Sequence, residues 1–371
     1  MQHELPLRIE GLQLSILAET KAQTDWIACK LAPMQLTDAN PVTRKLTLNI
    51  LSDWSMAAEL QTLLAEEEVT GTPVHPRKKR VLHVATTAEI DLCVDPVQGM
   101  IWLFDHKVGR ITCVTGPRTR FELSEGFSAV RAILVAHLHD QGWHTMHAGA
   151  IWADGATRLV IGNGGQGKTS LILALLAQGA GFVANERVLL KATEGGLRAL
   201  PFPMPTLVGL GTALQHPRLA WVLDHPETLA SEPHRFNPAN LANTARENWP
   251  ALPDKVPLLA SDIERLVLGA PARPGGKVEG VILPRLDPES DPSATLTDPE
   301  DAEQLLRSNY MPHNREKHYP DWMPLRFKPR TMEEPGATLD QLCRQPAATV
   351  RFFDVAQADG ILRQTIDCLT H

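Results

Sequence analysis

The sequence predicts an α/β protein in three parts: an α+β lobe over residues 1–142, an α/β core over 143–290 and a helical extension over 291–371. Three patterns support this division. Short strand-like runs dominate the first part, a strand, a glycine-rich loop, a helix and a strand follow one another in the second, and helical patterns return in the third. A chain of 371 residues is also long for one hydrophobic core, which favours more than one lobe.

The first part combines strands with helices. Between residues 5 and 53, the runs LRIEGLQLSIL, TDWIACKLA and KLTLNIL alternate as half-buried strands do. Residues 55–68 have a helical pattern, and the runs VLHVA, IDLCVD, MIWLFD and RITCVTG predict four strands separated by turns. Residues 124–139 predict an amphipathic helix that Ser124 caps.

The second part begins with a predicted hairpin, HAGAIWADGATRLVI, whose turn is Asp154-Gly155. Its second strand runs directly into a glycine-rich loop. A helix then extends from Lys168 to about Gln178 and ends at Gly179, because glycine readily adopts the left-handed conformation that ends helices. The next run, GFVAN, predicts a short strand, which completes a strand–loop–helix–strand unit.

Beyond residue 200, frequent prolines predict loops and short helices. The run DKVPLLASDIERLVLG predicts one further helix, and KVEGVILPRLD predicts one further buried strand. Residues 288–298 are polar and predict a surface loop. The runs DPEDAEQLLRSN and VAQADGILRQTIDCLTH then predict a helical end to the chain.

Composition limits the class of protein. The formal net charge of −7 argues against broad binding to nucleic acid. Five scattered cysteines exclude a dense disulfide framework and fit a reducing compartment. Glu4, Arg8 and Glu10 interrupt the segment where a signal peptide needs an apolar run, and no stretch approaches 18 apolar residues. We therefore expect a cytoplasmic protein that binds neither nucleic acid nor a membrane, and the sequence leaves its oligomeric state open.

The glycine-rich loop carries the clearest chemical signal. Residues 162–169, GNGGQGKT, match the pattern G-x-x-x-x-G-K-[ST] in full. Glycines let the backbone aim consecutive N–H groups at an anion in front of a helix N-terminus. In such a loop Lys168 reaches the β- and γ-phosphates, and the Thr169 hydroxyl is a ligand of Mg²⁺. The expected cofactors are therefore ATP and Mg²⁺. The expected nucleotide-binding residues are Gly162, Asn163, Gly164, Gly165, Gln166, Gly167, Lys168, Thr169 and Ser170.

The strand after the loop helix ends in Ala-Asn-Glu-Arg, so Asn185 and Glu186 follow the loop lysine by only about 17 residues. Together, MHAGAIWADG, GNGGQGKTS, LALLAQGAG and FVANERVLL resemble the HPr kinase/phosphorylase superfamily. The chain resembles the shorter HPr-kinase-like proteins of modified-peptide gene clusters better than the hexameric enzymes that phosphorylate HPr itself. The resemblance covers about residues 146–190 and continues more loosely to about 285. It implies a P-loop core of the HPr-kinase/PEP-carboxykinase-like type.

The resemblance also implies an activity. Members of this family are ATP-dependent kinases, so the expected reaction transfers the γ-phosphate to a Ser or Thr hydroxyl of a peptide or small protein. The family has a pair of acidic residues where this chain has Asn185 and Glu186. By position, Glu186 is expected to be the general base, and the expected metal ligands are Thr169, Asn185 and Glu186.

Further roles follow from the same resemblance. His147 matches the family's histidine, one hairpin ahead of the loop, and joins Glu186 and Lys168 as an expected catalytic residue. Arg187 and Arg285 are expected to contact phosphate or substrate.

Other interpretations of the sequence stay open. The acceptor could be a small molecule, or the chain could be an ATP-binding regulatory or scaffold protein in which Glu186 only pairs with a neighbouring cation. A nucleotide-driven hydrolase is a third option. The basic loop 75–80 and the stretch 309–324 could bind a peptide or be ordinary surface connections.

Overall fold

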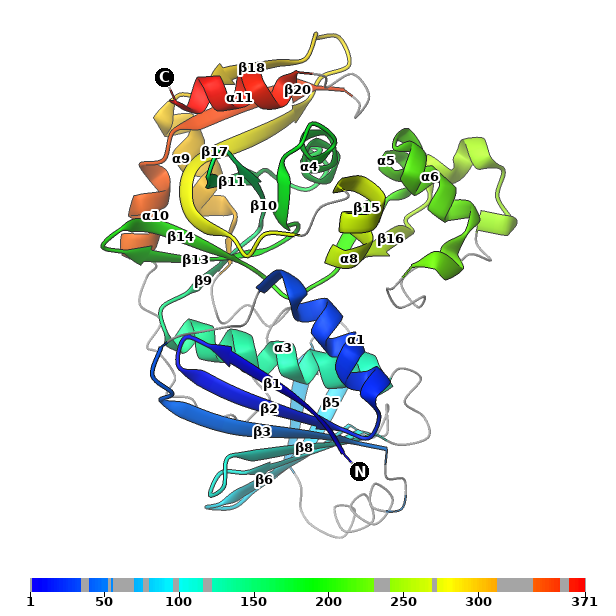
Figure 1. Ribbon diagram of the computed structural model, residues 1–371, viewed down its shortest axis with the longest axis vertical. Helices are drawn as coiled ribbons and strands as arrows, with labels where there is room; N and C mark the ends of the chain where they lie inside the picture. The colour runs from blue at the N-terminus through cyan, green and yellow to red at the C-terminus, as the bar shows by residue number, and fades with distance from the viewer. Residues whose placement is uncertain are drawn as a thin grey trace. The chain divides into compact units, whose positions relative to one another are not determined.

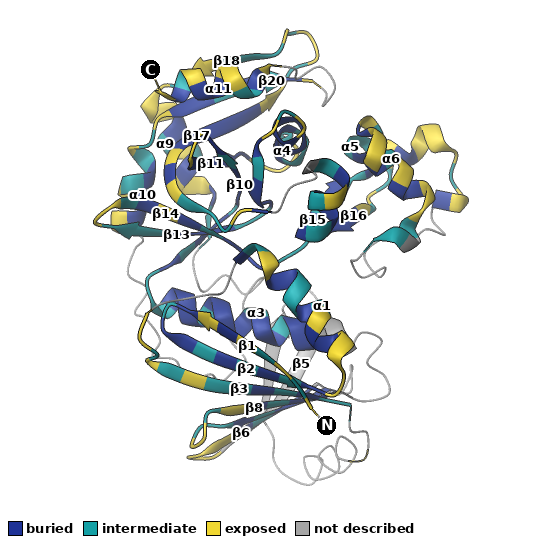
Figure 2. Ribbon diagram, in the orientation of Figure 1, coloured by how far each residue is buried: buried dark blue, intermediate teal, exposed yellow. Residues whose placement is uncertain are grey.

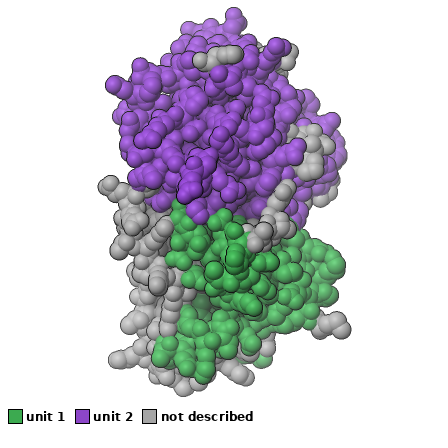
Figure 3. All heavy atoms as spheres, turned by 60° about the vertical axis from the view of Figure 1, so that its left-hand side comes forward, with its two compact units in different colours: residues 1–28, 36–142, 312–332 green, residues 29–35, 143–311, 333–371 purple. Residues whose placement is uncertain are grey.

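The computed structural model describes residues 2–34, 40–52, 55, 70–75, 80–95, 100–115, 122–229, 241–268, 272–311, 336–353 and 360–370. The chain divides into two compact units (Figure 3). Unit 1 consists of residues 1–28, 36–142 and 312–332, and unit 2 of residues 29–35, 143–311 and 333–371. Each unit contains helices and a mixed sheet, so the protein belongs to the mixed α/β class.

Within the described residues, unit 1 contains an eight-stranded sheet in the order β1-β2-β3-β8-β7-β6-β5-β4 (Figure 1). The strands are β1 (His3–Ile9), β2 (Leu12–Ala18), β3 (Arg44–Leu51), β4 (Thr70–His75), β5 (Arg80–Thr86), β6 (Ile90–Asp95), β7 (Met100–Asp105) and β8 (Arg110–Thr115). Helix α3 (Glu122–Asp140) packs against this sheet, and a β-carbon on Gly126 would lie 2.8 Å from the side chain of Ile50 in β3. The four strands expected from VLHVA to RITCVTG are confirmed as β5 to β8.

One expected strand of the N-terminal part is wrong. The run TDWIACKLA lies in helix α1 (Lys21–Leu31), which the short helix η1 (Ala32–Met34) follows. Its buried residues Thr24, Ile27 and Leu31 are spaced three and four apart, which is the period of a helix face rather than of a strand. The helix expected over 55–68 falls, apart from Ser55, outside the described residues.

Unit 2 contains a ten-stranded sheet within the part of the chain that the structure describes. Its main path is β12-β10-β11-β17-β14-β13-β9-β19, while β20 pairs with β17 and β18 pairs with β20. The strands are β9 (His144–Met146), β10 (Ala148–Ala153), β11 (Ala156–Ile161), β12 (Gly181–Ala184), β13 (Val188–Thr193), β14 (Gly196–Pro201), β17 (Gly276–Leu286), β18 (Ser293–Leu296), β19 (Tyr310–Met311) and β20 (Ala347–Phe352). Strands β11, β17 and β20 are parallel neighbours.

Helices cover both faces of this sheet. Val160 and Ile282 belong to the hydrophobic cluster of α4 (Lys168–Ala177) and α11 (Ile361–Thr370). Leu159 and Val281, which point the other way, belong to the cluster of α9 (Pro299–Ser308) and α10 (Gly336–Cys343). Figure 2 shows the resulting buried centre of unit 2. Burial on both faces explains the continuous apolar runs 159–161 in β11 and 281–283 in β17.

A smaller group of elements stands beside α4. It comprises the two-stranded sheet β15 (Thr206–Gly209) and β16 (Lys255–Leu258), with α5 (Leu210–Gln215), α6 (Pro217–Asp224), η2 (Pro226–Thr228), η4 (Arg246–Ala251), α8 (Ala260–Ile263) and the π-helical turn η5 (Glu264–Leu268). The Ser170 hydroxyl of α4 hydrogen-bonds the Thr212 hydroxyl of α5 at 2.9 Å and ties this group to the main sheet.

The C-terminal part differs from the expected helical extension. Residues 291–371 do contain α9, α10 and α11, but they also contribute β18 and β20 to the sheet. The run AATVRF of β20 pairs in parallel with the buried strand β17, and Ala348, Val350 and Phe352 are fully buried. Six residues are too few for the spacing of apolar side chains to distinguish a strand from part of a helix. No described helix is long and apolar enough to cross a membrane.

Candidate functional site

The glycine-rich loop leaves the sheet at the carboxyl end of β11, beside the carboxyl ends of the parallel strands β17 and β20. This edge of an open α/β sheet is where ligands usually bind. Gly165 and Gly167 adopt left-handed backbone conformations, with φ of 82° and 87°, and Gly167 is the N-cap residue of α4. The loop therefore turns sharply into the N-terminus of a buried helix.

The glycines of the loop are not equivalent. A β-carbon on Gly167 would lie 2.9 Å from side-chain atoms of Leu286 and Phe352, whereas one on Gly164 would meet nothing within 4 Å. We expect Gly167→Ala to lower the free energy of unfolding by about 2 kcal/mol, because it adds left-handed strain to a close contact. Gly164→Ala is the matched control and should change it by less than about 0.5 kcal/mol. Urea denaturation measures both, and equal effects would show that the loop is not held against β17 and β20.

Lys168 lies over the loop with its side chain only 8% exposed. Its Nζ donates to the carbonyl oxygens of Gly162, at 2.6 Å, and of Asn163, at 3.3 Å. Burial lowers the pKa of the Lys168 ammonium, while the negative charge of Glu186 opposes this shift. The structure thus places the lysine and the acidic residue expected from the sequence within electrostatic reach of each other.

Asn185 joins the end of β12 to the first turn of α4. Its side chain is 3% exposed, and its Nδ2 donates to Oγ1 of Thr169 at 3.1 Å. The Oδ1 atom is buried and has no hydrogen-bond partner within the described residues. Nδ2 faces the Thr169 hydroxyl, and Oδ1 lies 3.4 Å from where a β-carbon on Gly149 of β10 would be. Two of the three side chains expected to share a metal, those of Thr169 and Asn185, are therefore direct neighbours.

Glu186 occupies a strained backbone position. Its φ is 68°, and Arg187 N donates to Asn185 O across it at 2.8 Å, which makes a three-residue γ-turn. Among the residues that the structure describes, the other non-glycine residues with positive φ are Glu10 and Asp154, and both precede a glycine in a two-residue hairpin turn. Such a position costs about 1–2 kcal/mol, and this kind of strain concentrates at functional sites.

His147 faces this turn from the short segment between β9 and β10. Its Nε2 lies 3.9 Å from Oε2 of Glu186. Burial lowers the pKa of His147, the positive charge of Lys168 lowers it further, and Glu186 opposes them. The ring is therefore largely neutral at pH 7. The structure brings His147, Lys168 and Glu186 together, as the sequence analysis expects of the catalytic residues.

The two arginines have separate surroundings. The guanidinium of Arg187 lies 5.3 Å from the centre of the Phe202 ring, and its charge also acts on His147. Arg285 is exposed near the end of β17, on the other side of β11 from Asn185 and Glu186. The structure thus groups Arg187 with the predicted catalytic residues and sets Arg285 apart from them.

The sequence patterns do not identify two residues of the site, Lys255 and Asn309. The positive charge of Lys255, at the start of β16, lowers the pKa of both His147 and Lys168. Asn309 ends α9 and is 4% exposed. Its carbonyl accepts from His147 N at 2.9 Å, and its Nδ2 lies 3.5 Å from Oδ1 of Asn163. Asn309 therefore connects the glycine-rich loop to the histidine.

We expect Asn309→Ala to lower the free energy of unfolding by about 1 kcal/mol, the net value of one hydrogen bond. The buried Nδ2 donates to the Leu305 carbonyl at 2.9 Å, and after the substitution that carbonyl keeps its bonds from Asn309 N and the Ser308 hydroxyl. Asn163→Ala removes the exposed partner of the same contact and should cost less than about 0.5 kcal/mol. Urea denaturation of both variants measures the difference. A larger cost for Asn163→Ala would contradict the assignment of Asn309 as the anchor.

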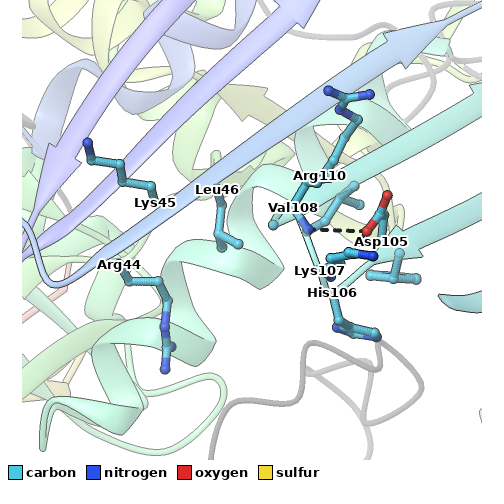
Figure 4. Close-up of a pocket in the computed structure, with 11 residues that line it drawn as sticks. Arg44, Lys45, Leu46, Asp105, His106, Lys107, Val108 and Arg110 are labelled. Atoms are coloured by element: carbon cyan, nitrogen blue, oxygen red, sulfur yellow. Dashed lines mark hydrogen bonds between the residues drawn. The ribbon is translucent and has the colours of Figure 1, made fainter. Parts of the chain in front are cut away.

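A second candidate lies in unit 1. A cavity of about 440 Å³ is lined by the start of β3 and by the β7–β8 turn, and four of its residues are Arg44, Lys45, Lys107 and Arg110 (Figure 4). Figure 4 shows the side chains of Arg44, Lys45 and Arg110 pointing in different directions. Charges that do not converge on one point make a poor site for a specific anion. The glycine-rich loop is therefore the better candidate for an anion-binding site.

The remaining candidate segments, 76–79 in the basic loop and 312–324 in the aromatic stretch, lie outside the described residues. The described residues contain no group of three or more His, Cys, Asp or Glu side chains that could hold a metal ion. The sequence matches no model of a known protein family and no curated protein.

Proposed function

We propose that this protein is an ATP-dependent kinase of the HPr-kinase-like type, which transfers the γ-phosphate of ATP to a hydroxyl of a peptide or small protein. The observation that carries the proposal is the strained turn at Glu186. It places a carboxylate beside His147 and near Lys168, at the mouth of a loop with the full phosphate-binding pattern. Phosphoryl transfer depends mainly on such positioning and charge neutralisation.

Each residue has a role in this proposal. The amides of residues 162–168 and the Lys168 ammonium hold the phosphates at the N-terminus of α4. Glu186 accepts the proton of the acceptor hydroxyl, and the neutral ring of His147 orients that hydroxyl or the γ-phosphate. Arg187 and Lys255 add positive charge around His147. That positive charge attracts the negatively charged phosphate groups to the site.

Mg²⁺ fits the residues present. The Thr169 hydroxyl and the Glu186 carboxylate are hard oxygen donors, and the Asn185 carboxamide would offer its oxygen beside them with its amide turned over, since Nδ2 faces Thr169 in this structure. Mg²⁺ commonly takes one or two carboxylates and completes its coordination with water and phosphate. Bound there, it would neutralise charge on the β- and γ-phosphates.

Asn185 stands where the family that this chain resembles has one of its two acidic residues. This difference favours a second candidate, an ATP-binding regulatory or scaffold protein without turnover. A small-molecule acceptor remains the alternative within the kinase proposal, because the site around Glu186 does not depend on the rest of the acceptor.

Incubation with γ-labelled ATP, Mg²⁺ and soluble host extract tests the proposal. The comparison uses wild type, Lys168→Ala and the matched control Lys277→Ala, whose lysine is exposed at the opposite end of β17. Label in a polypeptide, with wild type and the control only, supports a peptide or protein kinase. Label in a small molecule supports a kinase whose acceptor is a small molecule rather than a polypeptide. Label released only as phosphate indicates a hydrolase, and binding without consumption of ATP supports the regulatory protein.

A further inference from the structure

The side chain of Gln166 closes the glycine-rich loop on itself. Its Oε1 accepts a hydrogen bond from the backbone N–H of Asn163 at 2.5 Å. Because that N–H can only donate, the carboxamide must present its oxygen, and not its nitrogen, to Asn163. The backbone N–H of Gln166 also donates to the carbonyl of Asn163 at 3.3 Å. One residue of the loop therefore holds both backbone polar groups of another.

The chain between these two residues makes a tight turn through Gly164 and Gly165. The backbone bond from residue 166 to residue 163 closes the turn, and Gly165 has the positive φ, 82°, that the third position of a type II turn requires. A β-carbon on Gly164 or on Gly165 would have no atom of the described residues within 4 Å. Packing therefore does not hold this tip of the loop, and its hydrogen bonds decide its conformation.

The Gln166 carboxamide lies over Gly162, at the start of the loop. A β-carbon on Gly162 would be 2.8 Å from Oε1 of Gln166, which is too close for a real contact. Residue 162 must therefore be glycine for the glutamine side chain to fold back in this way. The phosphate-binding pattern leaves the residue type at position 166 open, so the pattern by itself does not indicate this bond.

The bond from Asn163 N–H also bears on Lys168. The carbonyl of Gly162 and the N–H of Asn163 belong to one planar peptide unit, so fixing the direction of one fixes that of the other. Gln166 binds this unit at its N–H, and Nζ of Lys168 binds it at its carbonyl, at 2.6 Å. The peptide unit thus lies between the two side chains, and the glutamine orients the carbonyl that receives the ammonium.

We infer that Gln166 is a positioning residue, whose side chain holds the empty loop and Lys168 in the conformation that receives phosphate groups. This inference rests on the proposed nucleotide-binding function and adds to it a residue that prepares the loop before the ligand arrives. Preparation of this kind increases affinity by reducing the ordering that binding requires. Bound phosphates would hold the loop through several amides at once, so Gln166 contributes to binding and not to the rate of the bound complex.

Calorimetric titration with two probes, tripolyphosphate·Mg²⁺ and ATP·Mg²⁺, tests the inference by comparing wild type with Gln166→Met. Methionine has about the length of glutamine, and its sulfur is only a weak acceptor. We expect the affinity for both probes to fall by about 5-fold, the factor that corresponds to one net hydrogen bond. In steady-state measurements, KM for ATP should rise by the same factor, while the rate at saturating ATP should change less than about 2-fold.

Gln178→Met is the matched control. Gln178 follows the other end of α4 and is half-buried, as Gln166 is, and its Oε1 likewise accepts a backbone hydrogen bond, from Leu362 N at 3.0 Å. The substitution removes the same kind of bond away from the loop. It should leave the affinity for both probes and KM for ATP unchanged.

Other outcomes overturn the inference in distinguishable ways. Unchanged affinities in Gln166→Met would show that the loop keeps its conformation without the side chain. Tighter binding would show that the side chain obstructs the loop. A loss for ATP alone would indicate a contact with the base or sugar, and a lower rate at saturating ATP would place the role of Gln166 in the bound complex. In each of these cases the proposed function stands, whereas a wild type that binds neither probe would overturn that function and the inference together.

Discussion

Replacement of Lys168 by methionine is expected to lower the rate of phosphoryl transfer by about 100- to 1000-fold, which is the usual effect of removing one positioned charge from a transition state. Methionine keeps most of the length and apolar volume of the lysine stem, so the buried position stays filled. The loss therefore reports the missing ammonium. Steady-state rates with γ-labelled ATP measure it, and thermal unfolding verifies that the variant folds.

Lys277→Met is the control for this prediction. It removes a lysine whose Nζ pairs with Glu279 at 2.8 Å on the exposed start of β17, and its rate should equal that of wild type. If Lys168→Met transferred phosphate at the wild-type rate, the glycine-rich loop would not hold the transferred group, and the whole assignment of the site would be wrong.

Glu186→Gln is expected to lower the rate by about 100- to 10,000-fold and, in the absence of Mg²⁺, to change ATP affinity by less than about 3-fold. The range is that of removing a general base, and the substitution keeps the shape of the side chain while removing its charge and basicity. The turn at residue 186 keeps its left-handed strain in this variant. Rate measurements at saturating ATP and calorimetric titration separate the two effects.

Glu186→Gly provides a matched comparison, because glycine adopts a φ of 68° without the penalty that glutamate bears. We expect the same loss of rate, with a free energy of unfolding about 1 kcal/mol higher than that of wild type. A stabilised, inactive variant would show that the strain is maintained to position the carboxylate. Wild-type turnover in either variant would refute Glu186 as the base and would require another group to accept the proton of the acceptor hydroxyl.

The local features of the fold are predictable from the sequence because their signals lie within a few residues. The Asp154-Gly155 hairpin is confirmed with Ala153 opposite Ala156, and the loop helix ends two residues before Gly179, whose φ is 100°. The contact between Thr169 and Asn185 is also predictable from the sequence, because only one short helix and one short strand separate the two residues. Each of these positions follows from turn chemistry and from the length of a single helix.

The rest depends on pairings between distant segments. Asn309 lies 146 residues from Asn163 in the sequence, and its own pattern is that of an ordinary helix end. Lys255 is an exposed lysine, and its local sequence does not indicate that the pairing of β15 with β16 brings its charge near His147 and Lys168. Likewise, the run of β20 becomes a sheet strand only because β17 offers a buried parallel edge. Tertiary pairing, not local propensity, decides such elements.

The hydrogen bonds of Lys168 to the carbonyls of Gly162 and Asn163 have a consequence for selectivity among anions. An incoming oxygen must displace these two acceptors, so binding is an exchange in which one phosphate oxygen gains little over the contacts that it replaces. We expect chloride or a single sulfate to gain too few contacts for a favourable exchange. If the loop binds a nucleotide as proposed, a chain of phosphates would engage several loop amides at once and compete better. We therefore expect the resting loop to discriminate against the simple anions of the cell by competition from its own backbone.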